Sequence, residues 1–374
     1  MPVRILFACG GTAGHINPAL AVAGLLKEKN PDTQILFAGN PKGMEARLIT
    51  AAGYDFAPIE VLGFQRRLSL HNIKNNAMAI RYLLTASNKA RKIIEKFAPD
   101  VCMGTGGYVS GPVVRQAAKM GIPTLTHEQN AFPGVTTRLL CKYVNIALLA
   151  VPQAREYLPD GMNAVITGNP VRREILLADR EQSRAKLGVG DKICLLSFGG
   201  SLGAKRINEA IAEVMAWHHV KVKIHHIHAT GQYGVEMFPK LLAEKGIRIE
   251  SDKNIDLREY ISDMPDCLAA ADLVICRAGA ISISELQAAG RASILIPSPN
   301  VAGNHQYHNA KPLAAKNAAI LIEEKDLTGQ RLIEVISGLA GDPQELRNIG
   351  RNAAGMAIPD AGERICKEIE RLLA

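Results

Sequence analysis

Residues 272–309, DLVICRAGAISISELQAAGRASILIPSPNVAGNHQYHN, contain the succession of strand, turn and helix that decides the fold. The apolar run Leu273–Cys276 is typical of a buried parallel strand, and Ala292–Ile296 predicts a second one that Pro297 closes. Between them, Arg277-Ala278-Gly279 predicts a tight turn, because glycine tolerates backbone angles that other residues resist. The stretch therefore predicts neighbouring parallel strands of an α/β sheet.

The segment between these two strands predicts a helix. It opens around Ser282, Ser284 and Glu285 and stops at Gly290, a common helix terminator. A helix start presents N–H groups and the positive end of the helix dipole, which suit a diphosphate. Glu285, one turn inside the helix, can accept two hydrogen bonds from a ribose diol. This layout favours a nucleotide-sugar site, and the alternative is an ordinary capped helix.

A polar loop is expected after the second strand. It contains Asn304, His305, Gln306 and Asn309, and the three amides among these side chains can read sugar hydroxyls. The alternative is a polar surface loop that binds nothing.

Composition narrows the class of protein. A chain of 374 residues with 47% apolar residues is long enough for two globular domains with full cores. Seven scattered cysteines without a C-x-x-C pair favour buried thiols in a reducing compartment. Residues 2–9 are too short for a signal peptide, and no run approaches the roughly 20 apolar residues of a membrane span, so we expect a cytoplasmic protein. The net charge of +8 indicates anionic partners, and without a nucleic-acid-binding motif these are anionic lipid or a phosphorylated substrate.

Three glycine-rich turns follow predicted strands. They are Gly10–Gly14 after Val3–Cys9, Gly104–Gly111 after Asp100–Met103, and Gly199–Ala204 after Ile193–Phe198. The first turn leads to a helix from Asn17-Pro18 and a strand over Gln34–Ala38, a βαβ unit. The G-x-G-x-x-G fingerprint is absent, and the second strand ends in Gly39-Asn40 rather than in an acid, which argues against a dehydrogenase.

Polar residues also follow a predicted strand over Thr124–Thr126. They are His127, Glu128, Gln129 and Asn130. Ligands of α/β proteins bind at the carboxyl ends of parallel strands, so these side chains are candidates for a site. The alternative is that they hold their own loop by hydrogen bonds.

The second half of the chain repeats the pattern after a linker at Gly168–Arg172. Further strands are expected over Lys223–Ala229, Ile255–Tyr260 and Ile320–Glu323, and helices broken at Pro359 are expected in the tail. The first of these strands contains three histidines, which are common zinc ligands, so a zinc site is considered. A strand places His226 and His228 on one face and His225 on the other, so a structural role is favoured.

Residues 64–96 form a basic segment with interleaved apolar residues. The basic residues are Arg66, Arg67, Lys74, Arg81, Lys89, Arg91, Lys92 and Lys96, with Glu95 as the acid among them. Such a segment can lie on an anionic bilayer. The alternative is a solvated helix whose apolar face belongs to the core.

Six blocks in fixed order resemble the MurG family of bacterial cell-wall glycosyltransferases, glycosyltransferase family 28. The blocks, which extend over nearly the whole chain, are residues 272–309, Gly10–His15, Gly106–Pro112, His127–Asn130, Gly168–Arg172 and Gly199–Ala204. The resemblance implies an α/β protein of GT-B architecture, with two Rossmann-like doubly wound domains facing a cleft. Residues 1–166 with 350–374 are expected to form the acceptor and membrane-side domain, and 167–349 the domain that binds the donor.

The resemblance also implies an activity. An enzyme of this family moves N-acetylglucosamine (GlcNAc) from UDP-GlcNAc to O4 of the muramyl sugar of undecaprenyl-pyrophosphoryl-MurNAc-pentapeptide (lipid I), with inversion. It is expected to work as a peripheral protein on the cytoplasmic face of the inner membrane, with lipid I, the anionic membrane surface and other cell-wall enzymes as partners, and without nucleic acid. No D-x-D motif occurs, so no obligatory metal is expected in the chemistry. No cofactor is expected. Helix-start N–H groups, Ser201 and Arg172 would meet the charge of the leaving group.

Residue roles follow from the same resemblance. His15 is the first candidate for the base that takes the acceptor proton, with phosphate binding as its alternative, and Glu128 is the second candidate. Ile261 is expected to contact the uracil through its backbone. The expected substrate-binding residues are Thr12, Ala13, Gly14, Asn130, Arg172, Ser201, Ile261, Ala280, Ile281, Ser282, Ile283, Ser284, Glu285, His305 and Gln306. Ala13 departs from the glycine usual in the family, and His305 from a frequent glutamine.

Two other classes of function remain open. One is a UDP-GlcNAc 2-epimerase, an isomerase on a similar two-domain frame, which would need acid/base carboxylates at its site. The other is a non-catalytic, membrane-docked protein that binds a nucleotide sugar.

Overall fold

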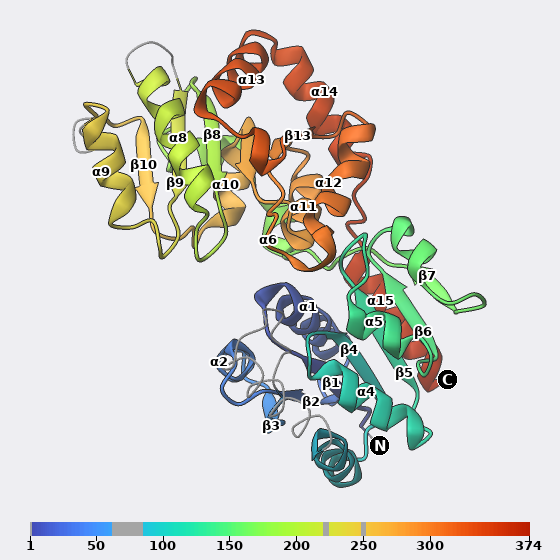
Figure 1. Ribbon diagram of the computed structural model, residues 1–374. Helices are drawn as coiled ribbons and strands as arrows, with labels where there is room; N and C mark the ends of the chain where they lie inside the picture. The colour runs from blue at the N-terminus through green and yellow to red at the C-terminus, as the bar shows by residue number, and fades with distance from the viewer. Residues whose placement is uncertain (1, 62–84, 220–223, 248–251) are drawn as a thin grey trace. The chain divides into compact units, whose positions relative to one another are not determined.

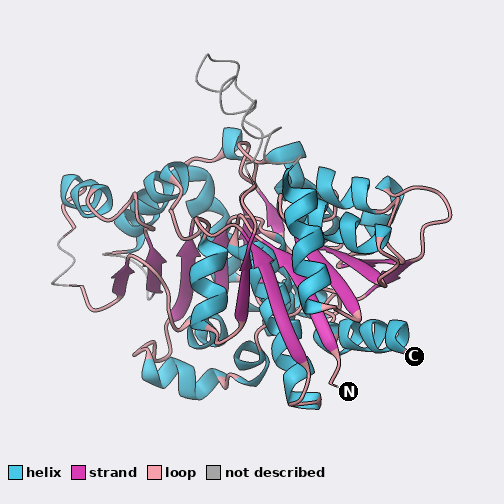
Figure 2. Ribbon diagram, turned by 90° about the horizontal axis from the view of Figure 1, so that it is seen from below, coloured by secondary structure: helices cyan, strands magenta, loops and turns pink. Residues whose placement is uncertain are grey.

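The structure, a computed structural model, describes residues 2–61, 85–219, 224–247 and 252–374. The chain divides into two compact units: unit 1 is Met1–Pro170 with Ile358–Ala374, and unit 2 is Val171–Ala357 (Figure 1). Each unit is built on a parallel sheet with helices on both faces (Figure 2). The expected α/β class with two doubly wound halves is confirmed.

The described strands of unit 1 form one parallel sheet in the order β3-β2-β1-β4-β5-β6-β7. Their bounds are β1 Arg4–Cys9, β2 Gln34–Gly39, β3 Asp55–Pro58, β4 Val101–Gly106, β5 Thr124–Glu128, β6 Ile146–Leu149 and β7 Ala164–Ile166. Its helices are α1 Ala13–Lys29, α2 Met44–Ala51, α4 Ser110–Lys119, α5 Val135–Leu140, the 3-10 helix η1 Pro152–Tyr157, α15 Ala361–Leu373 and a helical segment over residues 85–97. The alternation of strand side chains divides the core between two faces. Ile5 and Phe7 pack with α1 and α15, whereas Leu6 and Ala8 pack with α4 and the segment 85–97.

The described strands of unit 2 form a parallel sheet in the order β10-β9-β8-β11-β12-β13. Their bounds are β8 Ile193–Phe198, β9 Ile224–Ala229, β10 Ile255–Arg258, β11 Leu273–Cys276, β12 Ala292–Leu295 and β13 Ile320–Leu321. Its helices are α6 Arg173–Leu177, α7 Arg180–Lys186, α8 Lys205–His218, α9 Met237–Glu244, α10 Met264–Ala270, α11 Ala280–Ala289, α12 His305–Ala315, α13 Gly329–Gly341 and α14 Pro343–Ala354, with 3-10 turns η3 Ala302–Asn304 and η4 Glu324–Asp326. Leu195 packs with α8, α9 and α13, whereas Leu196 faces α10, α11 and α12.

Several sequence expectations were wrong in detail. The helix α1 begins at Ala13 rather than at Asn17, because extended Thr12 is its N-cap and Pro18 lies inside the helix. The polar loop expected around residue 305 is instead the first turn of α12, which starts after the left-handed Asn304. The short strands β3 and β6 were not predicted. The membrane-facing hypothesis for residues 64–96 falls largely on 64–84, which lie outside the described residues.

The carboxyl-terminal helices belong to different units. The helix α14 packs against α11 and β12 of unit 2, whereas α15 packs against α1 of unit 1. Ile365, Cys366 and Ile369 of α15 are fully buried in the core of unit 1. The tail from about residue 350 was expected to pack on the first domain; residues 358–374 do so, whereas residues 350–357 belong to unit 2.

A chain of buried histidines crosses the core of unit 2. The Ser197 hydroxyl lies 2.8 Å from His226 Nε2 and 2.7 Å from His228 Nδ1. Nε2 of His218, at the end of α8, lies 3.0 Å from His226 Nδ1. Burial lowers the pKa of His218 to about 4 and that of His228 to about 3, and it also lowers the pKa of His226. The histidines therefore serve as neutral hydrogen-bonding groups, and no cluster of three metal ligands occurs among the described residues.

Candidate functional site

Both sheets have a point where the strand order reverses, next to the strand that starts each unit. In unit 1 this switch point lies between β1 and β4, and in unit 2 between β8 and β11. Ligands of doubly wound proteins bind outside the carboxyl ends of the strands at such points. The glycine turns that the sequence singled out follow β1 and β8, and the Arg277–Gly279 turn follows β11. The turn expected over Gly104–Gly111 begins inside β4, because that strand extends to Gly106. The motifs therefore gather at the two switch points.

The glycine turn after β8 is held against the residues that follow β9. Gly203 has a positive φ of 84°, and a Cβ on it would lie 2.2 Å from the Thr230 carbonyl oxygen. The backbone oxygen of Ser201 accepts a hydrogen bond from the Gln232 N–H at 3.2 Å. Ser201 itself is exposed in the turn, and α8 begins four residues later at Lys205. The chain thus presents a rigid backbone turn with an accessible hydroxyl.

The start of α11 is the second component at this switch point. The extended Gly279 is its N-cap, and its first turn contains no acidic residue. Ile281 and Ser282 lie at positions where a helix offers N–H groups without intrahelical acceptors. The hydroxyl of Ser284, an expected substrate-binding residue, donates to the Ala280 carbonyl oxygen at 3.1 Å. Gly290 ends the helix, as the sequence predicted, and it adopts the left-handed conformation.

Glu285 lies one turn inside α11 and is 9% exposed. Its Oε1 accepts a hydrogen bond from Arg172 Nε at 2.8 Å, and Arg172 precedes the short helix α6. Burial raises the pKa of the Glu285 carboxyl, and the nearby guanidinium opposes that rise. Arg172 was expected to pair with phosphate, and here it orients the carboxylate that was expected to hold the ribose.

The first turn of α12 presents two polar side chains expected to bind sugar. Gln306 Oε1 accepts a hydrogen bond from the Ser298 N–H at 2.8 Å. His305 Nδ1 lies 3.0 Å from the Ala302 carbonyl oxygen, so this nitrogen carries the proton and Nε2 is the acceptor. Asn309, whose amide was expected to bind sugar, is buried, and it donates a hydrogen bond to the Ala278 carbonyl oxygen at 3.2 Å.

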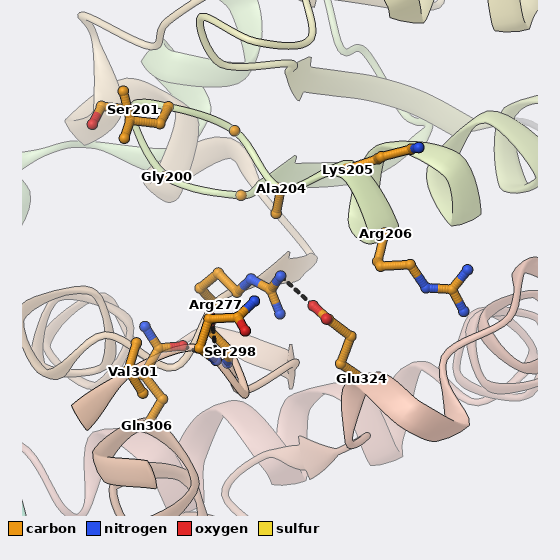
Figure 3. Close-up of a pocket in the computed structure, with 14 residues that line it drawn as sticks. Gly200, Ser201, Ala204, Lys205, Arg206, Arg277, Ser298, Val301, Gln306 and Glu324 are labelled. Carbon is orange, nitrogen blue, oxygen red and sulfur yellow. Dashed lines mark hydrogen bonds and ion pairs between the residues drawn. The ribbon is translucent and has the colours of Figure 1, made fainter. Parts of the chain in front are cut away.

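A cavity of about 500 Å³ opens beside these elements in unit 2 (Figure 3). It is lined by Gly199, Gly200, Ser201, Leu202, Gly203, Ala204, Lys205, Arg206, Arg277, Ser298, Asn300, Val301, Gln306 and Glu324. Two of the sequence-predicted residues, Ser201 and Gln306, are brought together in its wall. Ile261, which follows β10, is 4% exposed, and its side chain is part of the core, so only its backbone is suited to a ligand contact.

The glycine turn after β1 is held by an acid that sequence reasoning missed. Glu45, in the first turn of α2, is 1% exposed. It accepts hydrogen bonds from the N–H groups of Gly11 at 3.2 Å and Asn40 at 3.0 Å. The acid directly after Met44 at a helix start was the available sequence signal. Thr12 and Ala13 are exposed at the tip of this turn.

His15 lies on the first turn of α1 with its ring fixed in orientation. Its Nδ1 lies 3.0 Å from the Gly10 carbonyl oxygen and 3.3 Å from Thr12 Oγ1, so Nδ1 carries the proton and Nε2 holds the lone pair. The ring packs on Gly106, whose φ is 112° and where a Cβ would lie 2.6 Å from Cδ2 of the ring. The Thr105 hydroxyl donates to the His15 backbone oxygen at 2.7 Å. The arrangement presents one imidazole acceptor at the switch point of unit 1.

Glu128 and His127 lie inside β5 and are buried. Glu128 accepts hydrogen bonds on both carboxylate oxygens: from the Asn130 N–H and side-chain amide, each at 3.0 Å, from the Gly134 N–H at 2.9 Å, and from the Thr137 hydroxyl at 2.6 Å. His127 Nε2 donates to the Gly168 carbonyl oxygen at 2.9 Å, and burial lowers the pKa of the imidazole. These hydrogen bonds indicate that Glu128 and His127 stabilise the neighbouring loops.

Comparison with known proteins identifies the family of the chain. Models of the N-terminal and C-terminal domains of glycosyltransferase family 28 match residues 5–148 and 194–365. A protein of Acetivibrio thermocellus is 43% identical over 99% of this chain and 98% of its own length, and one of Desulforamulus reducens is 42% identical over 99% of both chains. The chain belongs to glycosyltransferase family 28. Both family members are called UDP-N-acetylglucosamine--N-acetylmuramyl-(pentapeptide) pyrophosphoryl-undecaprenol N-acetylglucosamine transferase.

A solved family 28 structure supports the architecture. The crystal structure of Acinetobacter baumannii MurG is 30% identical to this chain, with a TM-score of 0.78 over 99% of this chain and all of that one. The expected GT-B fold is thereby confirmed. The described helices contain none with the length and apolar content of a membrane span.

Proposed function

We propose that this family 28 protein is the inverting transferase that moves GlcNAc from UDP-GlcNAc to O4 of the muramyl sugar of lipid I, forming lipid II for peptidoglycan. The observation that carries the proposal is Glu285, a buried carboxylate one turn inside a helix start at the switch point of unit 2. A carboxylate there accepts hydrogen bonds from a ribose diol, while N–H groups of Ile281 and Ser282 meet the diphosphate. Full-length identity of 43% to a protein named for this transfer supports the same choice.

Unit 2 is the donor-binding part of the enzyme in this proposal. Residues 167–349 were expected to form it, and the compact unit is Val171–Ala357. Ser201 and the glycine turn after β8 bind the diphosphate, and the backbone of Ile261 contacts the uracil. His305 and Gln306 form hydrogen bonds with the sugar hydroxyls. The hydrogen bond from Ser298 to Gln306 Oε1 supports the last role, because it leaves the Gln306 Nε2 protons as the donors.

Unit 1 supplies the acceptor side, with Thr12, Ala13, Gly14 and His15 at the turn after β1. Inversion implies direct displacement, in which a base takes the proton of the acceptor hydroxyl as the glycosidic bond forms. His15 is favoured as this base, because its Nδ1 proton is engaged by Gly10 and its Nε2 is an acceptor. Glu128 is disfavoured, since its oxygens already accept from four donors, two of them on Asn130.

The protein acts as a peripheral protein at the cytoplasmic face of the inner membrane. Apolar side chains on and just after α5 support this placement: Val135 is 60% exposed, Leu139 58% and Tyr143 42%. Basic side chains accompany them, with the Arg115 guanidinium 5.0 Å from the Tyr143 ring centre and Lys142 exposed. Apolar groups beside lysine and arginine suit the surface of an anionic bilayer. Other cell-wall enzymes are the proposed protein partners.

The test of the proposed reaction is transfer of radiolabelled GlcNAc from UDP-GlcNAc to lipid I in detergent or vesicles. We expect labelled lipid II and free UDP. A 2-epimerase would instead convert UDP-GlcNAc alone to its manno epimer, and a binding protein would give neither product. Either of those results would reject the transferase.

Transfer should proceed at an unchanged rate after treatment with EDTA. The chain has no D-x-D motif, so neutral and cationic hydrogen-bond donors are expected to meet the charge of the departing diphosphate. The measurement is the initial rate of lipid II formation before and after chelation. A rate abolished by EDTA and restored by Mg²⁺ would contradict this expectation.

Replacing Glu285 by alanine should weaken UDP binding about 10- to 100-fold, because a hydrogen bond to a charged group contributes about 1.5–3 kcal/mol. Burial already disfavours the charged form of this carboxyl, so its loss should change the melting temperature little. Titration calorimetry with UDP measures the effect. Glu334→Ala is the matched control, since it removes an exposed carboxylate paired with Arg331 in the same unit. An unchanged UDP affinity in Glu285→Ala would remove Glu285 from the ribose site.

A further inference from the structure

Arg277 connects the ends of three neighbouring strands beside the cavity of unit 2. It follows β11, and one terminal nitrogen, Nη1, donates to the carbonyl oxygens of Ile296 at 3.2 Å and Pro297 at 3.3 Å, just after β12. The other, Nη2, pairs with the carboxylate of Glu324, which follows β13. The side chains of Arg277 and Glu324 are each only 15% exposed. Figure 3 shows the pair in the cavity wall, with Ser298 and Gln306 beside it.

The peptide that Arg277 holds leads directly to a proposed sugar contact. Ser298 follows Pro297, and its N–H donates to Gln306 Oε1 at 2.8 Å. This bond orients the Gln306 amide, so that the Nε2 protons remain as donors. A shift of the Ile296–Pro297 peptide would therefore move the Ser298 N–H and rotate the amide of Gln306.

We propose that Arg277 and Glu324 are positioning residues that set the Gln306 amide for the sugar of a bound nucleotide sugar. The inference rests on the proposed function, in which Glu285 holds the nucleotide and Gln306 reads the sugar. The pair acts through the loop after β12 and touches no reacting atom. The Gln306 amide needs neighbours that fix its orientation, because rotation of the amide would break its hydrogen bond to a sugar hydroxyl.

Binding of UDP and of UDP-GlcNAc separates this role from general stabilisation. Arg277→Met combined with Glu324→Met removes both charges together, so that no buried charge is left unpaired. We expect the UDP affinity to stay within about twofold, while the affinity for UDP-GlcNAc falls about tenfold, the effect of one hydrogen bond. Arg206→Met is the matched control: Arg206 lines the same cavity but donates to Leu327, not to the loop after β12. Its ratio of the two affinities should be that of the wild type.

The decisive comparison uses Gln306→Ala. If the Arg277–Glu324 pair acts through Gln306, the double substitution should have no further effect on UDP-GlcNAc affinity in a Gln306→Ala background. Additive losses, equal losses for both ligands, or an unchanged ratio would overturn the inference. If the double substitution prevents folding, Glu324→Gln carries the test, with a smaller shift of the same ratio expected and an unchanged ratio contradicting it. A wild-type protein that binds neither UDP nor UDP-GlcNAc would instead reject the proposed function, and this inference with it.

Discussion

Replacing His15 by alanine should lower kcat for GlcNAc transfer by about 10²- to 10⁴-fold, the range that a general base contributes. The imidazole is the acceptor that the glycine turn of unit 1 presents, with its Nδ1 proton engaged by the Gly10 carbonyl oxygen. Removal of the ring should leave UDP affinity unchanged, because the donor is assigned to unit 2. The measurement is kcat and the KM for lipid I at saturating UDP-GlcNAc, together with the melting temperature as a check of folding.

His15→Gln distinguishes a base from a phosphate-binding residue. A glutamine amide can donate a hydrogen bond to a phosphate but cannot take a proton at neutral pH. If His15 is the base, both variants should have a similarly low kcat. A kcat near the wild-type value in His15→Ala, with a raised KM that His15→Gln restores, would instead assign the ring to the acceptor diphosphate.

Acidification should destabilise unit 2 through its buried histidines. The ordinary pKa of histidine is 6.5, whereas burial lowers that of His218 to about 4 and that of His228 to about 3. The unfolded chain then binds more protons than the folded one, so the stabilisation is complete above about pH 6.5 and is lost as the pH falls toward the folded-state values. Each such histidine should lower the free energy of unfolding by about 1.4 kcal/mol per pH unit in this window.

Urea denaturation at a series of pH values measures this slope. His218→Gln replaces a titrating donor by a neutral one, and we expect the slope between pH 6 and 4.5 to fall by about one proton equivalent. His308→Gln, which removes a histidine on α12 outside the network, is the matched control. Identical slopes for the wild type and His218→Gln would show that His218 is protonated as easily in the folded chain as in the unfolded one.

The fold was predictable from the sequence because several of its buried parallel strands are short apolar runs followed within a few residues by glycine. Ile193–Phe198 and Leu273–Cys276 were predicted with their observed bounds. The short edge strand β3 was missed because Asp55–Pro58 has a charged first residue and a proline at its end. The helix α1 was predicted too late, because Pro18 is typical of a first helical turn, whereas here it occupies the second.

The sequence predicted which residues belong to the site, but not the hydrogen bonds that hold them in place. The positions of Ser201, Glu285 and Gln306 follow from the motifs, because the ends of parallel strands bring loops together at a known edge of the sheet. Their partners do not follow, since hydrogen bonds between residues far apart in the chain depend on packing. The contact of Arg172 with Glu285 has no signal in local spacing, and the acid after Met44 indicates a helix start but not its contact with Gly11.

The placement of α15 has a consequence for biosynthesis. Its buried face fills the core of unit 1, yet it is encoded after all of unit 2. The ribosome therefore finishes the contiguous residues 171–357 while the domain begun first still lacks an interior helix. A nascent chain that has not yet extended through residues 358–374 therefore exposes the apolar core residues of unit 1 that α15 covers in the folded protein.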